Sequence, residues 1–358
     1  MAAGAPAAQE RFELENNIQA VSDALFEYDE AAHLALCEKK PWKSNPLYFK
    51  RVYVCATALI KMVMHARSGG NLEVMGIMQG YVKENAMVVT DAFPLPVEGI
   101  EYRVDLGPEG DEYLINYLDA AKPVKRFENS IGWYHSHPGF RPFLSGTDVT
   151  TQHNWQTYSD PWLAVVVDPL TTMSAGKVDI GAFRLYPQGY KPTTPPKFRQ
   201  DSKSIMSIRS DKEKDYGAHS DRYYELDMQY YKSTTQKKLL DILWLKFWVQ
   251  TLSSSSLLVN RDYHTGRLKD VAEKLERLDV GSSNYRRPAS SSASSSSDST
   301  LSTIAADCVE TCSEHACGMM TLVCKHILFN VMKAGDTSET AGEKEEKMDV
   351  GADDETTC

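Results

Sequence analysis

The hydrophobic and polar positions of the chain divide it into a middle part that mixes strands with helices and a C-terminal part that is mostly helical. Short or alternating apolar runs predict strands at residues 73–79, 87–92, 129–137, 162–167 and 179–186. Apolar residues spaced three or four apart predict helices at residues 14–36, 56–67, 112–121 and 148–158. Strands interleaved with helices in this way indicate an α/β fold, with a mixed sheet flanked by helices.

Changes in composition along the chain set the expected domain boundaries. A helical arm precedes a main globular domain, which contains one long insertion at residues 94–129. A Pro-, Lys- and Ser-rich second insertion, expected to be mobile, leads to a helical extension, a flexible Ser-rich linker, a final helix and a disordered acidic tail. The expected bounds, in that order, are residues 1–50, 51–190, 191–216, 217–280, 281–300, 301–333 and 334–358.

The helices of the C-terminal part are expected to serve assembly. In residues 239–252 the apolar side chains surround the helix, and in residues 267–278 they recur at helical spacing. Such helices outside a globular core favour a bundle shared with partner subunits, and the alternative is packing onto the chain's own domain. Asp241 and Lys246 interrupt the most apolar run, and no run approaches the ~20 apolar residues that a membrane span needs.

Composition narrows the classes of function. A formal net charge of −10 argues against a nucleic-acid-binding protein, which needs a basic face. The first residues, MAAGAPAAQERFELENN, lack the apolar region of a signal peptide. The seven cysteines are irregularly spaced, so we interpret them as the reduced thiols of an intracellular protein.

The candidate chemistry lies in residues 129–148, which read NSIGWYHSHPGFRPFLSGTD. If the apolar run before the histidines forms a strand, His135 and His137 point to the same side, and Pro138 ends the strand. Ten residues separate His137 from Asp148, whose carboxylate a loop can return to the histidines. Two imidazoles and one carboxylate, with a fourth position left open, are typical of a catalytic zinc site.

A purely structural explanation exists for part of this segment. Ser145 and Asp148 stand in the S-x-x-D arrangement of a helix start, with Ser145 as the N-terminal cap. The two roles are compatible, because the capped start of a helix is a rigid place from which to hold a ligand. Asp148 is therefore a candidate for both roles at once.

The string H-S-H-P followed by S-x-x-D resembles the motif of the JAMM (MPN-plus) metalloprotease family. The family motif also has an upstream glutamate, and the residue that matches it here is Glu73 in NLEVMGIMQG. The segment KLLDILWLKFWVQTLSSSSLL resembles the branch that supplies the catalytic fifth subunit of the COP-nine signalosome, rather than the proteasome-lid deubiquitinases. The resemblance covers about residues 16–280, with a weaker similarity at residues 301–331.

The resemblance implies an MPN (JAMM) domain that hydrolyses isopeptide bonds with one Zn²⁺ per chain. It implies that the zinc ligands are His135, His137 and Asp148. It also implies that Glu73 is the general acid–base and that Ser145 stabilises the oxyanion.

The resemblance also implies a substrate, partners and a location. The implied substrate is a cullin-RING ligase whose cullin carries the NEDD-type ubiquitin-like modifier. The implied partners are other signalosome subunits, notably a second MPN subunit, in the cytoplasm and nucleus. The alternatives are a deubiquitinase of the proteasome-lid type and a non-catalytic MPN scaffold.

The insertion at residues 94–129 is implied to regulate the site. In the signalosome branch this insertion covers the active site of the isolated subunit. The residue that matches the inhibitory glutamate is Glu101, which would take the open zinc position, and Arg103 matches the arginine that pairs with Asp148. Considered without the resemblance, the charges of the insertion favour a solvated loop.

One feature differs from the family pattern. After H-S-H-P the family usually reads GYGCWLS or GFGCWLS, whereas this chain has Arg141, Pro142 and Phe143 in place of the glycine, cysteine and tryptophan. We expect this change to affect substrate fit or rate rather than zinc binding.

Residues 308–326 hold four cysteines and two histidines whose order matches no common zinc module, so packing in a core is preferred to a second zinc site.

Overall fold

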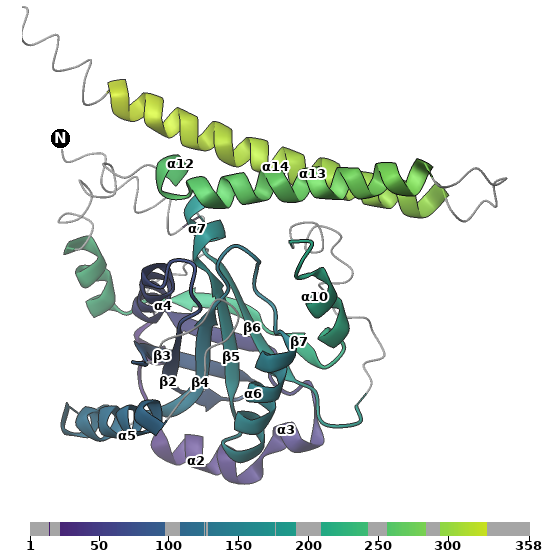
Figure 1. Ribbon diagram of the computed structural model, residues 1–358. Helices are drawn as coiled ribbons and strands as arrows, with labels where there is room; N and C mark the ends of the chain where they lie inside the picture. Colours follow the sequence, from purple (N-terminus) through teal and green to yellow (C-terminus); the bar gives the residue numbers. More distant parts are fainter. Residues whose placement is uncertain are drawn as a thin grey trace, which may run out of the picture.

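The computed structural model describes residues 14, 22–96, 108–124, 126, 128–175, 177–190, 209–242, 256–283 and 294–327. Within these residues, eight strands form one sheet in the order β7-β6-β5-β4-β2-β3-β1-β8 (Figure 1). The strands are β1 (Arg51–Cys55), β2 (Met75–Lys83), β3 (Ala86–Pro94), β4 (Asn129–Ser136), β5 (Leu163–Asp168), β6 (Asp179–Leu185), β7 (Tyr223–Glu225) and β8 (Asp227–Tyr231). The predicted mixed sheet is confirmed, because β1 is parallel to β3 and β8, β4 is parallel to β5, and the other neighbours are antiparallel.

Helices cover this sheet on both faces, as the α/β prediction requires. Figure 1 shows α2 and α3 at one end of the sheet, and α7 with the long helices α13 and α14 at the other. The helical segments are η1 (Asp23–Leu25), α2 (Glu30–Lys39), α3 (Pro41–Ser44), α4 (Ala56–Ser68), α5 (Pro108–Ala121), η2 (Lys122–Val124), α6 (Gly146–Tyr158), α7 (Pro169–Ala175), α10 (Glu213–His219), α12 (Ser256–Val259), α13 (Arg261–Ser283) and α14 (Ser294–His326).

The two edge strands of the sheet are consecutive in the sequence. β7 pairs with β6 and β8 pairs with β1, and Leu226 alone separates them. The Leu226 N–H also donates a hydrogen bond of 2.9 Å to the Ala182 carbonyl on β6. The prediction of a helical extension at residues 217–280 is therefore wrong at β7 and β8. The sheet edges supply the hydrogen-bond partners that make this aromatic segment extended.

Two apolar cores lie on opposite faces of the sheet, because side chains alternate along each strand. On β5, Val165 belongs to the core covered by α4, whereas its neighbours Ala164 and Val166 belong to the core covered by α6. Trp133 on β4 also belongs to the second core. Since His135 follows Trp133 by two residues, the candidate metal ligands lie on the side of the sheet that α6 covers.

The N-terminal arm is less helical than predicted. α2 begins at Glu30, where the Asp29 carboxylate accepts the Ala32 N–H as an N-cap, and it ends where Lys40 adopts a φ of +43°. Residues 26–29 are not helical, and residues 15–21 lie outside the described part of the chain. A second short helix, α3, follows directly at residues 41–44.

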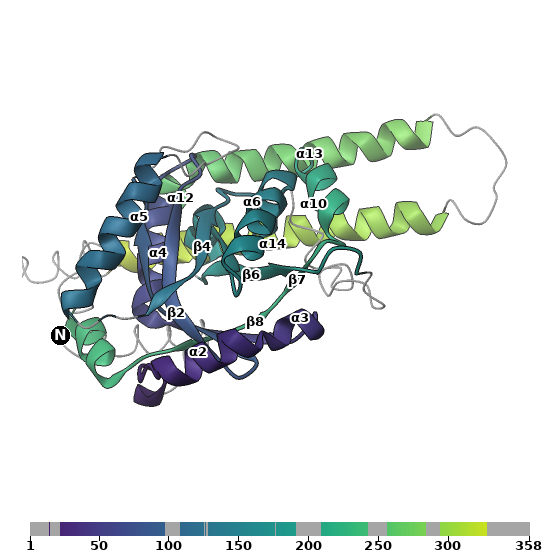
Figure 2. The ribbon, with the colours of Figure 1, turned by 90° about the horizontal axis from the view of Figure 1, so that it is seen from below.

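The last described part of the chain is a hairpin of two helices, α13 and α14, which meets the domain at α7 (Figure 1). Figure 2 shows the two helices running side by side. The prediction of a flexible linker at residues 281–300 is wrong at both ends, because α13 extends to Ser283 and α14 begins at Ser294. Among the helices that the structure describes, none combines the length and apolar character needed to span a bilayer.

Two glycine-to-alanine substitutions should have opposite effects on stability. Gly80 lies where the pairing of β2 with β3 shifts register, and a Cβ there would overlap the Val88 carbonyl oxygen. Gly80→Ala should therefore lower the free energy of unfolding by about 2 kcal/mol or more. Gly266 lies in α13, and outside its chain neighbours and the adjacent backbone of its own helix no described atom lies within 4 Å of the place that a Cβ would take. Gly266→Ala should therefore raise the free energy of unfolding by about 1 kcal/mol. Urea unfolding measures both, and a neutral Gly80→Ala would contradict the assigned register.

Candidate metal centre

The three predicted metal ligands meet at one end of β4. His135 lies on β4, His137 follows the strand directly, and Asp148 lies in the first turn of α6. The two Nε2 atoms are 3.1 Å apart, and they lie 3.4 and 3.5 Å from Asp148 Oδ2. A tetrahedral zinc ion with ligands at about 2.0–2.1 Å would separate its ligand atoms by about 3.3–3.4 Å. The donor types and their spacing therefore fit zinc, and no other cluster in the described residues brings three such groups close enough to hold a metal.

Neighbouring side chains fix the orientation of both imidazole rings. His135 stacks on Trp133 at 4.5 Å between ring centroids, and Trp133 Nε1 donates a hydrogen bond of 2.8 Å to Gln152 of α6. His137 stacks on Phe140 at 4.4 Å, and its Nδ1 lies 3.1 Å from the Arg141 carbonyl oxygen. A proton on Nδ1 of His137 would donate to that carbonyl and leave the Nε2 lone pair for a metal.

Asp148 is held by the helix start that the sequence predicted. The Ser145 hydroxyl accepts the Asp148 N–H at 3.3 Å, and Asp148 Oδ2 accepts the Ser145 N–H at 2.8 Å. Burial alone would raise the pKa of Asp148, but His135 and His137 hold it well below its ordinary value. The carboxylate is therefore anionic, as a ligand must be. Because the cap uses Ser145 Oγ as an acceptor, the hydroxyl proton remains for another partner.

Glu73 lies beside the metal ligands but just before β2, not inside the strand as predicted. The Val74 N–H donates to Ser136 Oγ at 3.0 Å, and the Ser136 N–H donates to the Val74 carbonyl at 3.0 Å, so this segment is fixed next to β4. Burial raises the pKa of Glu73 to about 7, with His135 opposing the shift. A carboxyl group with a pKa near neutrality is suited to proton transfer.

Asp168, which the sequence analysis did not identify, organises the loop after the histidines. Its fully buried carboxylate accepts the N–H groups of Gly139 and Arg141, each at 3.0 Å. It also accepts the N–H groups of Leu170 and Thr171 at 3.0 Å and the Thr171 hydroxyl at 2.7 Å. Gly139 and Arg141 have φ values of +80° and +70°, so the loop is sharply bent. The run VVVDPLT contains the signal, an aspartate and a proline at a helix start.

Comparisons with known proteins agree with this geometry. Residues 47–161 match the family model described as "JAB1/Mov34/MPN/PAD-1 ubiquitin protease", and residues 253–330 match "Cop9 signalosome subunit 5 C-terminal domain". The chain is 48% identical to COP9 signalosome complex subunit 5 of Dictyostelium discoideum, over 91% of this chain and 97% of that protein. It is 46% identical to the Drosophila melanogaster protein of that name, over 92% and 98% of the two chains. The chain belongs to the COP9 signalosome subunit 5 family.

Membership of the subunit 5 family confirms the resemblance drawn from the sequence. The JAB/MPN match spans all five residues singled out for the site, from Glu73 to Asp148. These comparisons support, in general terms, the assignment of the chain to the JAMM-type isopeptidases. Glu101 and Arg103 lie in residues 97–107, which are outside the described part of the chain.

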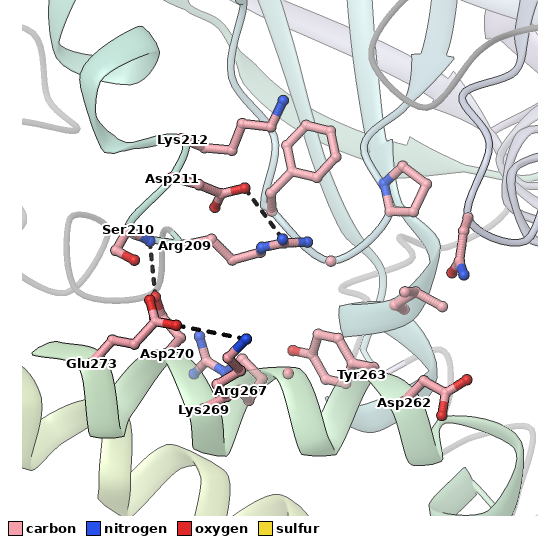
Figure 3. A pocket seen from close by; sticks show the side chains of 16 residues that line it. Arg209, Ser210, Asp211, Lys212, Asp262, Tyr263, Arg267, Lys269, Asp270 and Glu273 are labelled. Carbon is pink, nitrogen blue, oxygen red and sulfur yellow. Dashed lines mark hydrogen bonds and ion pairs between the residues drawn. The ribbon is translucent and has the colours of Figure 1, made fainter.

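The last residues of the second insertion, 209–216, pack against the loop after the histidines, although the sequence analysis predicted a mobile segment there. Lys212 Nζ lies 4.9 Å from the centre of the Phe140 ring, and the buried Tyr216 packs edge-on against Phe143 at 5.5 Å. A pocket of about 390 Å³ lies between residues 209–212, the loop after the histidines and α13 (Figure 3). The three candidate metal ligands do not line this pocket.

Four cysteines lie on α14, within the part of the chain that matches the family's C-terminal domain. Cys308 is half-buried, whereas Cys312, Cys317 and Cys324 are exposed. The described side chains of α14 supply no cluster of three metal-ligand groups. The preferred interpretation of these cysteines as core residues is wrong for the three that are exposed, because the packed face of α14 lies on the other side of the helix.

Asp168→Asn should destabilise this subunit 5 relative. The amide keeps one acceptor oxygen, and its NH₂ group would face N–H donors that are now paired with the carboxylate. We expect the free energy of unfolding to fall by about 2–3 kcal/mol, measured by urea unfolding. The exposed Asp221 is a matched control, and Asp221→Asn should change stability by less than about 0.5 kcal/mol. Equal effects of the two substitutions would contradict the role given to Asp168.

Proposed function

We propose that this chain is a zinc-dependent isopeptidase that removes a NEDD-type ubiquitin-like modifier from a cullin lysine as the catalytic subunit of a signalosome. The observation that carries the proposal is the triangle of two Nε2 atoms and one Oδ2 atom, 3.1–3.5 Å apart, beside the buried Glu73. The similarity to COP9 signalosome subunits over most of the chain supports the setting of the reaction. The match at residues 253–330 favours this branch over the proteasome-lid type.

In the proposed mechanism, His135, His137 and Asp148 hold the zinc. Zinc, when bound, would polarise the scissile carbonyl and lower the pKa of the attacking water. Glu73 takes a proton from that water and passes it to the lysine amine as the C–N bond breaks. The Ser145 hydroxyl donates a hydrogen bond to the carbonyl oxygen as negative charge develops on it, and the helix cap fixes the position of Oγ.

The proposed assembly uses the C-terminal helices. On α14, Val309, Met320 and Val323 are 69%, 67% and 54% exposed, and a helix that displays such side chains is suited to packing in a bundle. The proposed partners are other signalosome subunits, notably a second MPN subunit, in the cytoplasm and nucleus. Co-purification with such subunits is the test, and a chain that stays alone in their presence would exclude this part of the proposal.

The insertion at residues 94–129 is proposed to inhibit the isolated chain, through Glu101 at the open zinc position and Arg103 at Asp148. The described flanks of the undescribed segment support this. Tyr117 of α5 stacks on Phe93 at 3.8 Å, and Phe93 belongs to the same core as Trp133 beneath His135. The strand before the segment and the helix after it therefore both pack on the face that carries the candidate site.

Glu73→Gln should abolish turnover but keep the metal. The amide has nearly the same shape as the carboxyl group but cannot accept the proton of the attacking water, so we expect the rate to fall at least 100-fold, on the order of a lost general base. Cleavage of neddylated cullin by the assembled complex measures the rate, and metal analysis of the chain measures zinc. A variant that still cleaves at the normal rate would exclude Glu73 as the base.

Two controls accompany this experiment. A zinc chelator should remove activity, whereas thiol alkylation should leave it largely intact, because no cysteine takes part in the proposed reaction. Ubiquitin chains incubated with the same complex separate the alternatives. Preferential cleavage of the chains would favour a deubiquitinase, and a chain without zinc would favour a scaffold.

Glu101→Ala should activate the isolated chain. Removing the carboxylate that is proposed to occupy the open zinc position frees that position for water, so cleavage by the isolated chain should increase several-fold, on the order of 10-fold. The same substitution should change the activity of the assembled complex little. An isolated variant as slow as the unaltered chain would argue against inhibition by Glu101.

A further inference from the structure

The loop between His137 and Ser145 is held by the C-terminal hairpin as well as by the sheet. Arg141 stands at the meeting point, because its backbone contacts His137 and its side chain contacts α14. We infer that Arg141 is a positioning residue that couples the docking of α14 to the orientation of His137, and so to zinc binding. The inference rests on the proposed function in one respect, that His137 is a zinc ligand.

The backbone of Arg141 sets the position of the His137 ring. The Arg141 carbonyl oxygen lies 3.1 Å from His137 Nδ1, and the Arg141 N–H donates to Asp168 at 3.0 Å. With a φ of +70°, the residue occupies a narrow region of backbone conformation. In a metal-binding histidine, the second ring nitrogen usually has a hydrogen-bond partner. Altering that partner commonly weakens metal binding about 10- to 100-fold. A shift of this peptide would therefore reach the metal through His137.

The side chain of Arg141 joins two elements that are far apart in the sequence. One guanidinium nitrogen lies 3.3 Å from Asp179 at the start of β6, and the other lies 2.7 Å from Glu310 on α14. The Arg141 side chain is 28% exposed, so this ion pair is shielded more than a surface pair. Arg267 of α13 also binds Glu310, at 3.2 Å. Glu310 therefore connects both helices of the hairpin to the loop.

A second contact joins the hairpin to the same loop. A Cβ on Gly139 would lie 3.2 Å from the Tyr263 ring of α13, so the ring packs directly against the loop backbone. Figure 3 shows Tyr263 projecting from α13 toward the pocket. The Tyr263 hydroxyl lies 3.2 Å from Thr171 Oγ1, which donates to Asp168. The hairpin thus contacts the loop at two residues, at Arg141 through Glu310 and at Gly139 through Tyr263.

Apart from the Tyr263 ring, the hairpin meets its own domain through polar contacts that water can replace. Besides the Arg141–Glu310 pair, Asn260 donates to the Leu170 carbonyl at 2.9 Å, and Ser174 lies 3.2 Å from His264. Hydrogen bonds of this kind contribute little net free energy each, so docked and undocked hairpins can interconvert. Coupling between two equilibria is reciprocal. If docking favours zinc binding, zinc binding must favour docking by the same factor.

The test is amide hydrogen exchange of the full chain with and without Zn²⁺, followed at residues 307–318 of α14. In the unaltered chain, zinc should slow exchange there about fivefold, at the lower end of typical coupling. Arg141→Gly removes the side chain and suits the left-handed backbone, and Glu310→Gln removes the charge on α14 without altering the loop. In both variants the exchange of α14 should no longer respond to zinc. The Kd for zinc should rise by the same factor, about fivefold.

Asp307→Asn is the matched control. Asp307 pairs with Lys274 at 2.9 Å between the same two helices but does not contact the loop in the described structure. This variant should speed the exchange of α14 while keeping its response to zinc and the Kd for zinc. If Asp307→Asn lost the zinc response as Glu310→Gln does, general loosening would explain the result and the role of Arg141 would be refuted.

The remaining outcomes also decide between the proposals. Should Arg141→Gly fail to fold, Glu310→Gln carries the test alone. Zinc that binds the unaltered chain without changing the exchange of α14 would overturn the coupling but leave the proposed function standing. Failure of the unaltered chain to bind zinc would overturn both.

Discussion

The buried carboxylate of Asp168 is the interaction on which the arrangement of the site depends. A fully buried carboxylate is costly unless hydrogen-bond donors surround it. Asp168 accepts hydrogen bonds from two N–H groups of the loop, and from two N–H groups and the Thr171 hydroxyl of α7. The same contacts hold Gly139 and Arg141 in left-handed backbone conformations. Because His137 leads directly into this loop, the direction of its ring is set by a residue on a neighbouring strand.

The contacts that hold the candidate ligands in place are thus the same contacts that stabilise β4 and α6. β4 lies between β2 and β5, so its register is fixed on both sides. His135 is held in place by stacking on Trp133, which belongs to the core that α6 covers. Asp148 is fixed by the Ser145 cap, which α6 needs in any case. Substitutions that spare all the ligands can therefore still impair the site, because structural contacts determine where the ligands lie.

The sequence predicted those parts of the structure that local patterns determine. The strand before the histidines, the α6 cap and the meeting of His135, His137 and Asp148 followed from spacing. Glu73 was found only through the family resemblance, because no local pattern distinguishes it from the other acidic residues, which number 49 with it. β7 and β8 were missed because their extended conformation depends on partners at the two sheet edges. The contacts of Arg141 could not be predicted from local patterns, because Glu310 lies 169 residues further along the chain.

The position of Arg141 also changes the interpretation of the altered loop. From the sequence, a bulky cation beside the histidines was expected to affect substrate fit or rate. In the structure its guanidinium pairs with Asp179 and Glu310, while its carbonyl faces His137. α14 is therefore held to the domain by polar contacts on one side and displays apolar side chains on the other. Under the proposed coupling, a partner that packs on the apolar side would keep α14 docked or draw it away, and through Arg141 either event would act on His137, the candidate metal ligand.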